Sequence, residues 1–260
     1  MQSLKIFFAF LLVSISSQAQ YMNNSISGNR LSSFNVAHAG LDGNQVNFSG
    51  ILNSKFGSNN SLLFETRLGK SNFSMSGILE NNSGIYYSGG RKQLGLSYRF
   101  DLNNDKTLSF GLGYERLNSF AMSNIKPVHF LHNDYHVKRL GTVYGGKRFK
   151  IGVDFAHYSA ASIVHSNFYS FNLIYHQNII NRENFQLNTN LVLSNFNSSL
   201  EAELLFRNKY SVVTGYDVKR GTYVGLGYKV SDNLELNLST SQFTNYSPRP
   251  SIQFGLKFNF

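Results

Sequence analysis

Strict alternation of apolar and polar residues is the feature that most limits what this chain can fold into. From about Asn44 to Phe260, apolar side chains recur at every second position over many short segments, with Asn, Ser, Gly or charged residues between them. Segment 184–194 is the clearest case, since Phe185, Leu187 and Leu191 alternate with amide side chains. In an extended strand successive side chains point to opposite faces, so the pattern predicts a sheet with one apolar and one polar face.

Short clusters of Gly, Asn, Asp and Ser separate the alternating segments, for example at 69–72, 103–105 and 231–233. Such turn signals between strands predict consecutive antiparallel hairpins, about 12 to 14 strands in all. We expect strands near 44–53, 61–68, 72–80, 92–101, 105–116, 137–145, 147–158, 168–178, 184–195, 198–206, 209–218, 221–230, 233–243 and 250–260.

Two architectures use alternating antiparallel strands: a secreted sandwich with an apolar interior, and a membrane barrel with an apolar exterior. The expected strands have roughly 10 to 12 residues, which suits a tilted membrane strand better than the five or six of soluble sheets. Backbone groups in lipid must all be paired, so the sheet must close. We therefore predict an all-β fold, a closed antiparallel transmembrane β-barrel over 44–260 that ends on the aromatic residue Phe260.

The first nineteen residues have the order of a secretory signal peptide. Lys5 precedes an apolar run from Ile6 to Val13, and small polar residues follow up to Ala19. That run is too short for a membrane-spanning helix, which needs about 20 apolar residues. We predict a signal peptide at 1–19, a periplasmic or plug segment at 20–43, and the outer membrane as the location of the mature protein.

The segment after the predicted cleavage site reads Gln20-Tyr21-Met22-Asn23-Asn24 and, further on, Asn35-Val36-Ala37-His38-Ala39-Gly40. It resembles the start of the PorP/SprF family of outer-membrane proteins. That family has Gln-Tyr-Met-x-Asn followed by Asn-Pro-Ala-Tyr-Ala-Gly. Here Val36 replaces the Pro and His38 replaces the Tyr, and the spacing is a few residues longer. The residues that match are Tyr21, Met22, Asn24, Asn35, Ala37, Ala39 and Gly40.

The resemblance implies a non-enzymatic accessory role in the type IX secretion system of gliding or adhesive Bacteroidetes, without a cofactor. The partners would be a secreted adhesin or its C-terminal sorting domain, the type IX secretion components, and the lipid and lipopolysaccharide of the outer membrane. Loops at 84–90 and 119–134 would form the docking surface. A plain alternative for Asn35 to Gly40 is a periplasmic arm that plugs the lumen or enters the first strand. A passive channel is the rival function.

An esterase is the third reading. His157 and Ser159 lie two residues apart, so both face lipid, and a base beside a serine can activate it as an acyl nucleophile. The run from His157 with Asn167 is similar to the active-site strand of lipid A deacylase barrels. Ala160 and Phe171 depart from that pattern, because the family has an Asn after the Ser and an acid on the next strand.

Other chemistry has little support in the sequence. His129, His132, Asp134 and His136 could ligate a metal, but a polar surface hairpin is the commoner explanation for such a stretch, and we assign no metal. The absence of Cys excludes thiolate sites. Basic pairs near strand ends lack an aromatic stacking platform, so we expect no nucleic acid partner. Strand glycines such as Gly111 and Gly113 leave room in the lumen.

Overall fold

The computed structural model describes residues 35–41, 43–53, 57–69, 71–83, 87–102, 105–122, 130–160, 168–182, 184–194, 198–218, 221–241 and 251–260. These residues form one short 3-10 helix and fourteen strands. The strands are β1 (Gln45–Asn53), β2 (Gly57–Arg67), β3 (Phe73–Ser83), β4 (Tyr87–Asp101), β5 (Thr107–Met122), β6 (Phe130–Gly145), β7 (Phe149–Ala160), β8 (Phe168–Arg182), β9 (Phe185–Ser194), β10 (Ser199–Phe206), β11 (Tyr210–Asp217), β12 (Gly221–Lys229), β13 (Leu234–Ser241) and β14 (Ser251–Asn259).

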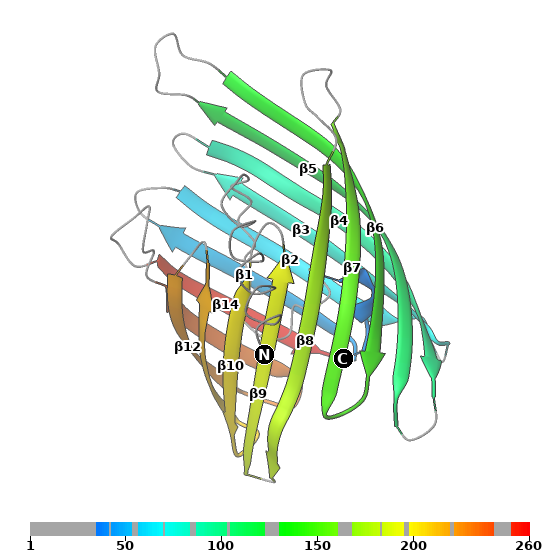
Figure 1. The fold of residues 1–260 in the computed structure, drawn as a ribbon. Helices are drawn as coiled ribbons and strands as arrows, with labels where there is room; N and C mark the ends of the chain where they lie inside the picture. The colour runs from blue at the N-terminus through cyan, green and yellow to red at the C-terminus, as the bar shows by residue number, and fades with distance from the viewer. Residues whose placement is uncertain are drawn as a thin grey trace, which may run out of the picture.

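The fourteen strands close into a single antiparallel barrel. Each strand pairs with its neighbours in sequence, and β1 pairs with β14 to complete the wall (Figure 1). At that seam Ser49 lies opposite Gly255. Closure satisfies both edges of the sheet, which is what a strand structure in lipid requires. The predicted fold class is confirmed, with the strand number at the upper end of the expected range.

The barrel is apolar outside and polar inside. On β5, the outward side chains of Phe110 and Leu112 are 46% and 65% exposed, whereas the inward side chain of Ser109 is 1% exposed. Neighbouring rings on the outer surface also touch, since the ring centroids of Tyr98 and Phe100 are 4.7 Å apart. A soluble protein rarely exposes so much contiguous apolar surface, whereas a bilayer covers it. The described residues include no helix long and apolar enough to cross a membrane.

Several strands are longer than the sequence pattern predicts, most clearly β4, β5 and β6. The expected loops at 84–90 and 119–134 were wrong in part, because β4 already begins at Tyr87, β5 continues to Met122 and β6 starts at Phe130. Ladder pairing does not need apolar side chains, so strands continue past the apolar belt where polar pairs replace lipid contacts. One such pair joins Arg116 Nη2 and Asp134 Oδ2 at 2.7 Å. Residues 84–86 and 123–129 lie outside the described part.

The two ends of the barrel differ. Consecutive strands at one end are joined by tight turns, such as the one at Arg207 and Asn208, whose φ values are +52° and +49°. The start of β1 and the end of the chain meet at this end, where Phe260 N donates to Asn44 O at 3.2 Å. Bacterial membrane barrels keep short turns on the periplasmic side and longer loops outside. This end is therefore the periplasmic one.

Candidate functional site

A short N-terminal segment lies against the inner wall of the barrel. It comprises residues 35–41, with a 3-10 turn η2 (Val36–His38) at its centre, and it contacts β4, β5, β6 and β7. Asn35 begins the turn, and its side-chain oxygen accepts a hydrogen bond from Ala37 N at 2.9 Å. Residues 35 to 40 are all buried. The segment occupies lumen space that a simple pore would leave to water.

Glycines form the seat of this segment on the wall. They are Gly95, Gly111, Gly113, Gly141 and Gly152, all on β4 to β7. A Cβ at Gly111 would lie 2.5 Å from Ala37 N, and a Cβ at Gly113 would lie 2.6 Å from Val36 Cγ1. One at Gly141 would overlap Asn35 Oδ1. The close approach is possible only because these positions have no side chain.

Hydrogen bonds fix the Asn35 end of the segment. Its side-chain Nδ2 donates to the carbonyl oxygens of Thr142 and Val153, at 3.0 and 3.1 Å. The next backbone amide, Val36 N, donates to Asp154 Oδ2 at 3.3 Å. An amide side chain suits this position, since it can donate to the wall and accept from its own turn at the same time.

The other end of the segment is held from β2 and β4. Gly40 N donates to Glu65 Oε2 at 3.3 Å, and Arg67 Nε donates to Gly40 O at 2.9 Å. Ser97 Oγ donates to Ala39 O at 3.2 Å. Gly40 has φ +68°, a conformation that a residue with a side chain adopts at a cost. The two ends are thus tied to opposite sides of the same patch of wall.

A buried chain of charges runs beneath the segment. Arg91 Nε and Glu115 Oε1 are 2.9 Å apart, Arg139 Nη1 reaches Glu115 Oε2 at 3.3 Å, and Arg139 Nη2 reaches Asp154 Oδ1 at 2.7 Å. Gln93 also accepts from Arg139 at 3.1 Å. The four charged groups come from β4, β5, β6 and β7, and all are more than nine-tenths buried. The two arginines and two carboxylates of this buried set balance each other in charge, as burial in a low-dielectric wall requires.

A second polar cluster lies on β9 to β12. Glu201 Oε2 accepts from Tyr223 Oη at 2.8 Å, and Glu201 Oε1 accepts from Asn190 Nδ2 at 3.0 Å. Glu203 Oε2 accepts from Asn188 Nδ2 at 3.3 Å. Among the described residues, the hydrogen-bond donors to both carboxylates are neutral. This stretch of wall gives the lumen local acidic character.

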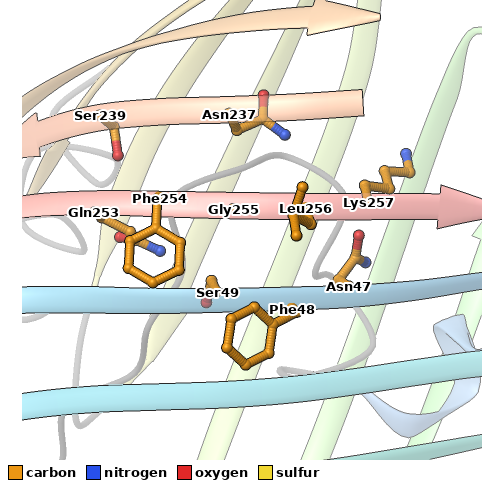
Figure 2. Close-up of a pocket in the computed structure, with 10 residues that line it drawn as sticks. All are labelled: Asn47, Phe48, Ser49, Asn237, Ser239, Gln253, Phe254, Gly255, Leu256 and Lys257. Carbon is orange, nitrogen blue, oxygen red and sulfur yellow. The ribbon is translucent and has the colours of Figure 1, made fainter. Parts of the chain in front are cut away.

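Near the closing seam the inner wall has a water-sized hollow of about 10 Å³ (Figure 2). Gly255 provides its floor, because a Cβ there would have its nearest neighbour, Asn237 Cβ, at 3.5 Å. Six polar side chains surround it: Asn47, Ser49, Asn237, Ser239, Gln253 and Lys257. Amides and hydroxyls thus line the lumen where the barrel closes.

The predicted serine and histidine lie on the outer face of β7. Ser159 Oγ donates to the carbonyl oxygen of His136 at 3.0 Å, and the His157 ring stacks on Tyr169 with centroids 4.8 Å apart. Lys138 and Tyr169 are the cross-strand neighbours of His157. The acid of the same strand, Asp154, points into the lumen. His157 and Ser159 therefore have separate partners in this geometry. Asn167 lies outside the described residues. The esterase function remains a prediction.

The histidine-rich stretch is spread along β6. Asp134 pairs with Arg116, and His136 Nδ1 contacts Tyr114 Oη. His129 lies outside the described residues. Within the described part of the chain, no three His, Cys, Asp or Glu side chains gather as a metal ion would need.

Four motif residues of the PorP/SprF resemblance fall in the seated segment: Asn35, Ala37, Ala39 and Gly40. Tyr21, Met22 and Asn24 lie outside the described residues, as does the predicted signal peptide. Sequence reasoning missed the charge chain and the glycine seat. A signal existed for the seat, since Gly111 and Gly113 were expected to leave lumen room, and Val36 and Ala37 fill it.

The sequence matches no family model and no curated protein. Among solved structures, it is similar to the CymD monoaromatic hydrocarbon channel, with TM-score 0.54 and 11% identity over 96% of this chain and 97% of that one. The Acinetobacter baumannii outer membrane protein Omp33 has TM-score 0.53 and 10% identity, over 84% and 97% of the two chains. The Pseudomonas putida toluene transporter TodX has TM-score 0.51 and 10% identity, over 94% and 96%. At this identity the likeness concerns the fold: the chain is an outer-membrane β-barrel, as predicted.

Proposed function

We propose that this protein is an outer-membrane channel for small polar solutes, with a lumen narrowed by the segment 35–41. The observation that carries the proposal is the sidedness of the closed wall, which is apolar outside and lined by amides, hydroxyls and charges inside. Buried polar walls are costly in a sheet that only has to pack, but they suit a lumen that hydrates a passing solute.

Two of the structural neighbours are a channel and a transporter, which supports the same proposal. Their substrates are monoaromatic hydrocarbons and toluene. The described lumen wall here is polar over most strands, so we do not extend those substrates to this protein. We propose hydrophilic solutes instead.

Conductance in planar bilayers tests the proposal. The wild-type protein should conduct ions with a small unitary conductance, because the seated segment takes up part of the lumen. Gly141→Val should raise the conductance, since a side chain at this position overlaps Asn35 and displaces the segment. The matched control is Gly255→Ala, a lumen glycine of the opposite wall where a Cβ has only ordinary contacts. If neither the wild type nor Gly141→Val conducts ions, the protein is not a channel.

The second candidate is the type IX secretion accessory, which assists secretion or surface attachment of an adhesin. One observation favours it: four of the seven residues that carry the PorP/SprF resemblance, Asn35, Ala37, Ala39 and Gly40, belong to the segment that lies in the lumen. A barrel filled there would act through its rim rather than its pore. A deletion strain should then retain or shed the adhesin, and the purified barrel should show no ion conductance in planar bilayers. Normal adhesin display in that strain would end this candidate.

A further inference from the structure

The apolar belt of the barrel ends abruptly on β4 to β7. Leu112 on β5 pairs with Leu96 and Leu140, so these three exposed side chains form one row across the outer surface. One step toward the long-hairpin end, Tyr114 pairs with Leu94 and Lys138. The next step places Arg116 opposite Lys92 on one side and His136 on the other. The outer surface of β4 to β6 thus changes within two rows from leucine, through a row that contains tyrosine and lysine, to a row that contains lysine, arginine and histidine.

This boundary lies at the outer leaflet. The tight turns and both ends of the strand sequence meet at the periplasmic end, so the hairpins beyond Arg116 are extracellular. Tyr114 and Tyr169 flank the boundary, and aromatic residues of this kind mark the membrane interface in β-barrels. The cations are therefore at the depth of lipid headgroups rather than in the hydrocarbon.

The charges at this boundary are unbalanced. Lys92 and Arg116 are directly opposite on neighbouring strands, an arrangement that like charges make unfavourable. Arg116 has an acid, Asp134, at 2.7 Å. Lys92 and Lys138 are exposed on the outer face and make no ion pair with any described residue. An anion that contacts both lysines would balance these two charges.

We propose that Lys92, Arg116 and Lys138 bind the phosphate of an outer-leaflet glycolipid, on the outside of β4 to β6. The leucine row below them would contact the acyl chains, and the flexible lysine stems let the ammonium groups reach a headgroup phosphate. A lipid satisfies both requirements at once, whereas free phosphate would use only the cations. The proposal depends on the outer-membrane placement and not on conduction through the lumen.

Native mass spectrometry of the detergent-solubilised full-length protein tests the site. The probe is diphosphorylated lipid A, compared with chemically dephosphorylated lipid A. The wild type should retain the phosphorylated form and lose most of the other. Lys92→Gln/Lys138→Gln should weaken retention at least about tenfold, since each lost cation removes a charge-assisted hydrogen bond.

The matched control is Lys147→Gln/Lys209→Gln, which removes two exposed lysines at the periplasmic turns. It should bind like the wild type. Heat-dependent migration on gels reports that each variant still forms the barrel. Equal retention by the two double variants, or equal binding of both forms of lipid A, would overturn the proposal. So would displacement of the lipid by inorganic phosphate at the lipid's own concentration, because the site would then recognise a free anion.

Discussion

Arg139 shows how a single side chain can hold four strands of this wall together. Its guanidinium on β6 reaches Glu115 on β5, Asp154 on β7 and Gln93 on β4. Asp154 in turn accepts from the backbone of the seated segment at Val36. Removing one partner of such a buried set leaves an uncompensated charge, which costs more than the intact pair contributes. One residue therefore supports both the wall and the docking of the segment.

Arg139→Leu should destabilise the folded barrel by about 3 to 5 kcal/mol, because Asp154 then remains buried without its cation. Urea titration in lipid vesicles, followed by circular dichroism, measures the change. Arg139→Leu/Asp154→Leu should recover part of the loss, since Arg91 and Glu115 still pair with each other. Arg116→Gln, which breaks an exposed pair, is the control and should change stability little. A double variant less stable than Arg139→Leu would contradict this account.

The backbone pairing between strands continues without a break beyond the apolar belt of the barrel. β5 and β6 pair without interruption from Thr107 and Gly145 to Met122 and Phe130. Their apolar alternation ends earlier, near Tyr114, which is why the sequence pattern predicts shorter strands. The seam between β1 and β14 is regular as well, with directly opposed residues along its length. The first and last strands thus pair as closely as hairpin neighbours do.

The double variant Ser49→Cys/Gly255→Cys should form a disulfide across the seam between β1 and β14. These residues are directly opposite, and directly opposite Cβ atoms lie about 4.5 to 5.5 Å apart. The chain contains no other cysteine, so the product is unambiguous. Gel mobility after mild oxidation, with and without reductant, detects the cross-link.

The diagonal pair Ser49→Cys/Gln253→Cys is the control, because diagonal positions are about 7 to 8 Å apart. Gln253 lies opposite Ile51 rather than Ser49. It should cross-link poorly. Equal yields from both pairs would indicate a mobile seam rather than the register described.

At the scale of the whole molecule, net charge and lumen charge differ. The full chain carries a formal charge of +10, but many of the described cations lie near strand ends, and Arg91 and Arg139 belong to the balanced set of charges on β4 to β7. On the inner wall of β10, Glu201 and Glu203 accept hydrogen bonds from neutral donors, and no cation among the described residues is a hydrogen-bond partner of either. Carboxylates that line a lumen favour cations over anions. The basic composition is therefore a poor guide to what the lumen admits.

If the lumen conducts, its current should favour potassium over chloride. Glu201→Gln/Glu203→Gln should move the reversal potential in a potassium chloride gradient toward zero, because the lumen loses its acidic pair. Asp105→Asn, at an exposed periplasmic turn, is the control and should leave the potential unchanged. An unchanged potential in the double variant would show that another part of the chain sets selectivity.

The sequence by itself determined the barrel, its sidedness and the approximate positions of all fourteen strands. Alternation has only two possible faces, and membrane strands must pair and close, so the pattern leaves little freedom. Tertiary structure alone decided which inward residues meet. Arg91, Glu115, Arg139 and Asp154 are far apart in the chain, and only the register of four neighbouring strands brings them into one network. The glycine seat likewise exists only because that register gathers bare positions under residues 35–41, and local alternation contains no information about register.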